Sequence, residues 1–321
     1  MTITTKDIVQ VEDLITSQEF GQARKLTKRL LNSTDLMPDS SDLRARFLYC
    51  LGLVKKHCDL LDSKDSAALE EPFLDVLNCA EASSVLKAQA NNQLALISVG
   101  GRNFEQADKY IESGFSQLTE ENTQNTKAYF ELSLTRVYRY IASRETTQAV
   151  TMLEHLTKHF QTLDAQRQQD QITELLLCIF ALEESRGNLE LAAKTIDMAR
   201  KICEIQNQTT NITFAEILLS QSAISLDREL RDQLLSACLN IYKRIFGYSK
   251  GKTRWILMSI ANSYQMESRV VEASKVFKKI ISIERRTGVD TISPYAKAMC
   301  AQCGTNNWIE TSELPRFSKA P

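Results

Sequence analysis

The chain has 321 residues, with only ten glycines and five prolines, and a formal net charge of −1 at pH 7. Turn-rich all-β folds need Gly and Pro at short intervals, so this composition excludes them. The balanced charge argues against a chain that binds nucleic acid or a membrane surface along its whole length. Residues 73–293 contain no proline, which favours helices, because proline breaks a helix interior.

Apolar residues recur at helical spacing and predict seven pairs of helices. In chain order the pairs are 5–16 with 19–33, 41–62 with 68–82, 84–99 with 104–118, 124–142 with 145–160, 166–185 with 189–205, 209–226 with 229–247, and 253–266 with 270–286. A capping helix is expected at 294–303, because Ser293 suits its N-cap and Pro294 its first position. Residues 305–321 are expected to form an extended tail.

A short sequence motif recurs where the second helix of a pair begins. It reads RNFEQA at 102–107, and altered copies end at Ala23, Ala149, Ala192 and Ala273. The spacing between these alanines is 42 or 43 residues, or about twice that, so each wide gap should hide one more copy. About seven units of about 42 residues therefore stack as a solenoid, because one helical hairpin cannot bury its apolar face alone.

The clearest unit is the last one. Its first helix has the large and small pair Ile260 and Ala261, and its second helix has Ala273, Phe277 and Ile280. These residues resemble the tetratricopeptide repeat, although the period is longer, the closing proline of each unit is absent, and units 41–82 and 209–247 match poorly. Longer repeats of this kind are seen in kinesin light chain and in bacterial peptide-sensing regulators. The resemblance implies an all-α fold, a right-handed α-solenoid forming one domain over residues 1–304.

The resemblance also implies that the first helices line a concave groove that binds an extended peptide or a partner helix. The groove candidates are Gln89, Asn92, Leu96, Trp255, Met258, Asn262 and Gln265. An equal alternative for Trp255 and Met258 is packing against the neighbouring unit. Because Met258 stands where chaperone-binding members of the family carry a lysine, no chaperone clamp is predicted.

Positive charge gathers near the end of the chain, where residues 241–290 hold eleven Lys and Arg against four acids. The candidate basic patch contains Lys250, Lys252, Arg254, Lys278 and Lys279. Such a patch could meet an acidic partner or a nucleic-acid backbone. A solvated surface without a partner is the favoured interpretation, because most charge runs are solvated.

The sequence shows no catalytic signature: it lacks a Gly-rich phosphate loop, a nucleophile elbow and a His-Glu-x-x-His motif. His155 and His159 lie four residues apart without further metal ligands nearby. Cys300 and Cys303 form a lone Cys-x-x-Cys pair, whereas a structural zinc site needs four ligands. We therefore predict no enzyme, no cofactor and no metal site, and expect the two cysteines to be thiols on the capping helix, one of which faces the preceding repeat.

The favoured hypothesis is a non-catalytic scaffold or adaptor that holds a partner protein in its groove as a subunit of a multiprotein complex. The alternatives are a peptide-sensing regulatory module and a nucleic-acid-associated helical repeat that uses the basic segment. The sequence shows neither an apolar run long enough to span a membrane nor a signal peptide. We therefore expect an intracellular protein, either cytoplasmic or nuclear.

Overall fold

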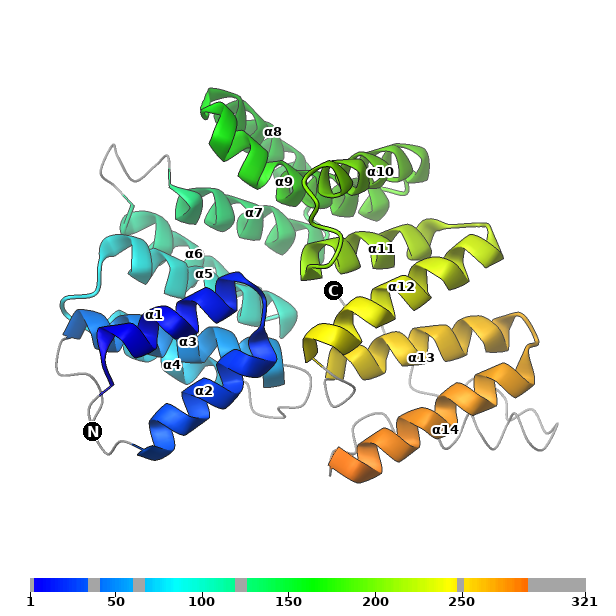
Figure 1. Cartoon of the computed structure of the whole chain (residues 1–321). Coiled ribbons are helices and arrows are strands. Elements are labelled where there is room, and N and C mark those ends of the chain that lie inside the picture. The colour runs from blue at the N-terminus through cyan, green and yellow to red at the C-terminus, as the bar shows by residue number, and fades with distance from the viewer. Residues whose placement is uncertain (1–2, 34–40, 60–66, 119–125, 247–250, 288–321) are drawn as a thin grey trace.

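The structure is a computed structural model, and it describes residues 3–33, 41–59, 67–118, 126–246 and 251–287. In these residues the chain forms fourteen helices and no strand, arranged as seven successive hairpins (Figure 1). The prediction of an all-α solenoid is therefore confirmed. The expected helix at 294–303, the tail at 305–321 and the Cys300–Cys303 pair lie outside the described residues.

The helix bounds agree with the predicted pairs to within a few residues at most ends. The first four hairpins are α1 (Thr5–Thr16) with α2 (Phe20–Ser33), α3 (Ser41–Asp59) with α4 (Ala67–Asn78), α5 (Ser84–Gly100) with α6 (Phe104–Ser116), and α7 (Lys127–Ala142) with α8 (Thr146–Thr162). The last three are α9 (Ala165–Ser185) with α10 (Leu189–Ile205), α11 (Ile212–Ile224) with α12 (Arg228–Phe246), and α13 (Gly251–Met266) with α14 (Val270–Thr287). The hairpins α3–α4 and α11–α12 fill the two wide gaps in the repeat.

Most first helices begin at a polar residue that caps them. The side chains of Ser83, Thr126, Asp164 and Asn211 each accept a hydrogen bond from a backbone N–H in the first turn of α5, α7, α9 and α11. Such caps satisfy amides that have no partner inside the helix. Ser83 also explains why α4 ends before residue 82, because the chain must turn before this cap.

Tight turns join the two helices of most hairpins, and each turn contains one residue with a left-handed backbone. These residues, with φ between 58° and 79°, are Gln18, Arg102, Arg144, Gly187 and Ser268. In each case the next N–H reaches back over the end of the first helix, as Asn103 N–H does to the Ser98 carbonyl at 2.8 Å. This is the Schellman arrangement, in which glycine is favoured. Among these five turns glycine holds the position once, which explains how the chain makes hairpins with so few glycines.

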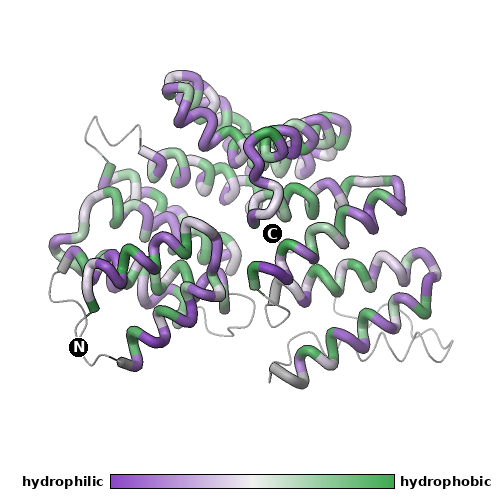
Figure 2. Tube along the Cα trace, viewed as in Figure 1, coloured by the Kyte–Doolittle hydropathy of each residue, from purple (hydrophilic) through white to green (hydrophobic). Residues whose placement is uncertain are grey.

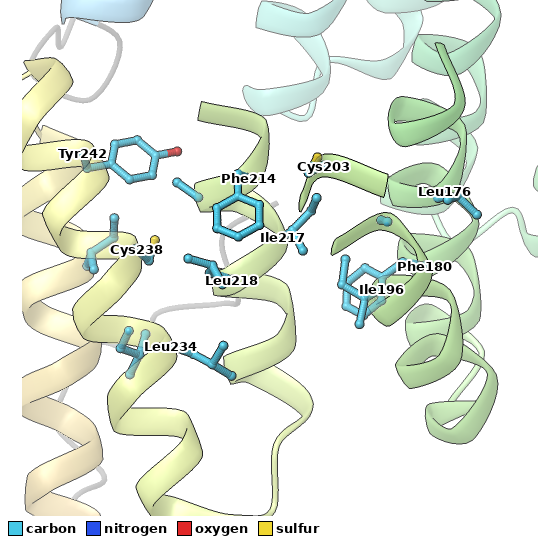
Figure 3. Close-up of a cluster of buried hydrophobic side chains, with 14 of the residues drawn as sticks. Leu176, Phe180, Ile196, Cys203, Phe214, Ile217, Leu218, Leu234, Cys238 and Tyr242 are labelled. Carbon is cyan, nitrogen blue, oxygen red and sulfur yellow. The ribbon is translucent and has the colours of Figure 1, made fainter. Parts of the chain in front are cut away.

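Apolar side chains fill the space within and between the hairpins, and they form stripes along the helices (Figure 2). The largest cluster joins α9 through α13, with Phe180, Ile196, Phe214 and Tyr242 among its members (Figure 3). In the second hairpin, Gly52 supplies the small residue of the large and small pair: a Cβ there would lie 2.6 Å from the Phe73 ring. The weak match of this unit to the repeat therefore conceals the same close helix packing.

The first and sixth hairpins also contact each other. The Ile212 N–H at the start of α11 donates a hydrogen bond to Gln18 Oε1 at 2.6 Å, and the Phe20 and Phe246 rings stack with centroids 5.8 Å apart. Repeats of a regular solenoid touch only their neighbours. Here α2 meets α12, so the superhelix closes on itself (Figure 1).

The strained turns predict a stabilising substitution. Arg102 and Arg144 are exposed and hold left-handed φ values of 58° and 65°. Replacing each by glycine removes the Cβ strain, and we expect the free energy of unfolding to rise by about 0.5–1 kcal/mol per site. Urea denaturation measures this change. The control is Gly187→Ala, which introduces a Cβ at φ 79° and should destabilise the protein; a loss of stability in the two Arg→Gly variants would contradict the argument.

Candidate partner-binding groove

The first helices of the hairpins form the inner layer of the solenoid. Within the described residues, substantial contacts between successive hairpins always involve a first helix, as between α1 and α3, α5 and α7, or α7 and α9. Helices that pack most closely along a solenoid lie on its inner side, where the radius is smallest. The inner face is therefore the surface on which a groove should be sought.

A row of partly buried polar side chains follows this inner layer over four successive first helices. We call Lys56 on α3, Gln93 on α5, Glu131 on α7 and Glu174 on α9 the inner polar row. The Lys56 ammonium donates a hydrogen bond to Gln93 Oε1 at 2.6 Å, and Glu131 lies 3.6 Å from the Lys127 ammonium one turn earlier on α7. A cation, an amide and two carboxyl groups thus follow one another along the row.

Burial dominates the electrostatics of the row. It lowers the pKa of the Lys56 ammonium to about 8, against the opposing attraction of Glu131. It raises the pKa of the Glu131 carboxyl and raises that of Glu174 to about 7, where the charges of Glu131 and Asp170 add to the effect and that of Lys127 opposes it. Glu174 Oε2 is buried and has no hydrogen-bond partner among the described residues. Charges that are poorly hydrated and incompletely paired are typical of binding sites.

Titratable side chains that are two hairpins apart lie close enough for one to shift the pKa of another across the interior of the solenoid. Lys56 belongs to the second hairpin and Glu131 to the fourth, yet their charges interact. Burial raises the pKa of Tyr138 on the fourth hairpin, and nearby Cys178, Glu174 and Glu216 raise it further; Glu216 belongs to the sixth hairpin. A ligand in this space would therefore contact several hairpins at once.

A pocket of about 310 Å³ opens beside the row, between α1, α3 and α5. Its wall includes Arg46, which makes a two-pronged ion pair with Glu12 at 2.7 and 3.0 Å, together with Tyr49 and Gln89. Gln89 is one of the groove residues predicted from the sequence. The Gln89 side chain therefore places an uncharged hydrogen-bond donor and acceptor next to the inner polar row.

The other predicted groove residues have different environments. Leu96, Asn262 and Gln265 are partly buried, and Trp255 is 37% exposed, so these residues stay predictions. Asn92 is buried between α5 and α7, where its Oδ1 accepts a hydrogen bond from Thr135 at 2.6 Å.

Met258 is also buried, within the core of the last hairpin. Asn92 and Met258 therefore hold helices together, and their prediction as groove contacts is wrong. On α5 the residue that contacts Lys56 in the inner polar row is Gln93, one position beyond Asn92.

The predicted basic patch is only partly present on the surface. Lys250 lies outside the described residues, as does the side chain of Lys252, while Lys278 and Lys279 are exposed on α14. Arg254 is fully buried, and its Nε lies 3.3 Å from a carboxylate oxygen of Glu284. The prediction that Arg254 belongs to a surface patch is wrong, because this guanidinium is an internal ion-pair partner.

The predicted histidine pair shows no metal geometry. The ring of His159 packs edge-on against Tyr129, with centroids 5.0 Å apart, and burial lowers its pKa. Across the described parts of the chain, no group of three or more His, Cys, Asp and Glu side chains is placed to hold a metal ion. The same parts contain no helix with the length and apolarity needed to cross a bilayer.

Sequence reasoning missed Lys56, Glu131 and Glu174. The available signal was the position of a charged residue within an otherwise apolar stretch of a first helix. Glu174, for example, lies in the segment ITELLLCIF at 172–180. Repeat templates overlook such residues because they score the conserved packing positions only.

Comparison with known proteins identifies the fold. No family model and no curated protein matches the chain. The apo form of RapI is 13% identical, with a TM-score of 0.47, over 92% of this chain and 79% of that protein. A Rap protein complexed with competence and sporulation factor is 12% identical, with a TM-score of 0.50, over 94% and 97%. The second likeness supports the tetratricopeptide-like helical-repeat fold that the sequence predicted.

The raised pKa of Glu174 predicts a pH-dependent effect of Glu174→Gln. Because the folded protein favours the protonated carboxyl, the stabilising contribution of this group is complete below its ordinary pKa of 4.5 and is lost as the pH rises through about 7. The variant should therefore unfold with a free energy about 2 kcal/mol higher than the native chain at about pH 8, allowing for solvent screening. The difference should vanish towards pH 4.5.

Urea denaturation at several pH values measures this effect. The control is Glu154→Gln on the exposed side of α8, which should give no pH-dependent difference from the native chain. Parallel stability profiles for Glu174→Gln and the native chain would show that Glu174 is well hydrated.

Proposed function

We propose that this protein is a non-catalytic scaffold or adaptor that holds a segment of a partner protein against its inner face, as a subunit of a multiprotein complex. The observation that carries the proposal is the inner polar row, with Lys56 and Glu174 both poorly hydrated and Glu174 Oε2 unpartnered. Such groups gain most from a ligand that supplies the missing hydrogen bonds.

The row suits an extended segment. The side-chain amide of Gln89 can pair with the backbone N–H and C=O groups that an extended chain leaves free. The Lys56 ammonium is a donor and the Glu174 carboxyl has an unpartnered oxygen, and the two lie on helices from different hairpins, so they would fix the direction of the bound segment. In support, the Rap protein of similar fold was solved with competence and sporulation factor bound, so a chain of this shape can hold another molecule.

A peptide-sensing regulatory module is the second candidate, and the pocket of about 310 Å³ beside Gln89 favours it. A pocket of this size accepts a few side chains of a short ligand. A scaffold would retain its partner at fixed stoichiometry, whereas a sensor would exchange its ligand. The nucleic-acid alternative loses support, because Arg254 is internal. The proposal places the protein inside the cell, in the cytoplasm or the nucleus.

Affinity purification of the tagged full chain from its own cells, followed by mass spectrometry, tests the proposal. We expect a partner at fixed stoichiometry, and binding about tenfold weaker or worse with Lys56→Gln and Glu174→Gln combined, because each lost charged hydrogen bond costs about 1.5–3 kcal/mol. The matched control is Lys158→Gln with Glu154→Gln on the exposed side of α8. Equal binding by both double variants would exclude the inner polar row as the partner site.

The last hairpin gives a second test of the same groove. Trp255 is partly exposed on α13, and Asn262 lies two turns further along that helix. If the partner extends to this hairpin, Trp255→Ala with Asn262→Ala should weaken binding severalfold, because aromatic anchors dominate interfaces. Circular dichroism should remain that of the native chain. Undiminished binding would restrict the groove to the hairpins before α13.

A further inference from the structure

The contact between the first and sixth hairpins has a specialised sequence. In the motif that opens the second helix, Gly21 stands where the other copies carry Glu105, Thr147, Glu190 and Val271. All four of those side chains are exposed on their own hairpins. A Cβ at Gly21 would lie at ordinary contact distance, 3.6 Å, from the Ile245 carbonyl oxygen, so a longer side chain there would have to find room against α12. The first hairpin thus carries glycine at the point where α12 approaches.

Phe20 shows the same specialisation through its burial. It is 3% exposed, whereas the corresponding Leu189 and Val270 on other hairpins are 55% and 39% exposed. Its ring stacks on His57 at 4.1 Å and on Phe246 at 5.8 Å between centroids, so it joins the second and sixth hairpins. A position that faces solvent on the fifth and seventh hairpins is therefore an interface position here.

Gln18 and α11 complete the contact. Gln18 holds the left-handed turn position, and its side chain accepts the Ile212 N–H, one of the first-turn amides of α11 that have no partner inside the helix. Every residue of α11 except Ala223 is buried or partly buried, with Phe214, Ile217 and Leu218 among the buried ones. Neighbouring elements therefore cover this helix on nearly all sides.

We propose that this contact is a reversible latch that closes the solenoid around the inner polar row and controls entry of the partner segment. The part of this inference that concerns entry rests on the proposed function. Among the described residues, the contacts of the latch include the hydrogen bond from the Ile212 N–H to Gln18, the stack of Phe20 on Phe246 and half-buried aliphatic side chains such as Ile245. Neighbouring hairpins, by contrast, share continuous apolar cores. Small rotations at each of the hairpin interfaces in between add up along the superhelix and separate the two ends.

Amide hydrogen exchange at Ile212 reports the latch directly, because the partner of this N–H belongs to the first hairpin. The internal control is Phe214, whose N–H is held by Asn211 of its own helix. Phe246→Ala and Gly21→Gln leave both hydrogen-bonding groups in place. We expect each to speed exchange at Ile212 about tenfold while Phe214 keeps its native rate, since opening is local.

The control variant is Glu105→Gln, which places the same side chain at the same repeat position of the third hairpin and should change neither rate. Small-angle X-ray scattering on the full chain should show a larger radius of gyration for Phe246→Ala and Gly21→Gln. Unchanged exchange at Ile212, or equal acceleration at Ile212 and Phe214, would overturn the latch.

Association kinetics with the purified partner test the control of entry. We expect Phe246→Ala and Gly21→Gln to raise the association rate constant severalfold over that of Glu105→Gln, because a larger fraction of molecules is open. Faster exchange at Ile212 with unchanged association would overturn control of entry. Failure to find any partner would overturn the proposed function, while the exchange and scattering results would still decide whether the latch exists.

Discussion

The structure depends on the inability of a single helical hairpin to bury its own apolar stripe. Each hairpin of this chain covers that stripe with the next hairpin, and a first helix takes part in every substantial contact between successive hairpins of the described residues. Small residues such as Gly52, Ala261 and Ala273 let the two helix backbones of a hairpin approach, and large neighbours fill the remaining space. Stability is therefore distributed over the interfaces between hairpins, as in other solenoids.

The scarcity of glycine and proline has its structural counterpart in the hairpin turns. The left-handed turn position, which usually carries glycine, is held by Gln18, Arg102, Arg144 and Ser268 in four of the described hairpins. Each of these residues costs some conformational strain, which the packing of the hairpin offsets. The Gln18 side chain also caps α11, because it accepts the Ile212 N–H across the contact between the first and sixth hairpins. The low glycine content thus reflects hairpin turns in which a residue with a side chain holds the position that glycine usually holds.

The fold could be predicted from the sequence because the residues that recur at the repeat spacing are those that pack the hairpins together. The alanine spacing located all seven hairpins, including α3–α4 and α11–α12, whose own motifs are weak. The site was harder to predict, because a template position does not fix the direction of a side chain to within one residue. The repeat template points to Asn92, whereas Gln93 is the residue that reaches Lys56. The charge pattern indicates a surface position for Arg254, although its partner Glu284 lies on the other helix of the same hairpin.

Contacts between distant hairpins could not be read from a repeat, since a repeat describes one unit and its neighbours. The two anomalies that pointed to ring closure were nevertheless in the sequence. Gly21 interrupts a position that is polar or exposed in the other copies, and α11 shows little separation of apolar from polar residues. Considered alone, each anomaly looks like a poor match to the repeat motif. Together they mark two surfaces that touch.

Ring closure and the electrostatics of the interior are linked by the same geometry. Lys56 and Glu131, or Tyr138 and Glu216, influence each other because the superhelix brings first helices that are two hairpins apart close together. Opening the latch would widen the interior, hydrate Glu174 and move its pKa towards the ordinary value for a carboxyl. The closed superhelix therefore keeps Glu174 poorly hydrated at a cost in free energy, and either water or a partner can reduce that cost. Because a partner that supplies the missing hydrogen bonds relieves it without opening the ring, binding favours the closed form, and closure in turn favours the partner.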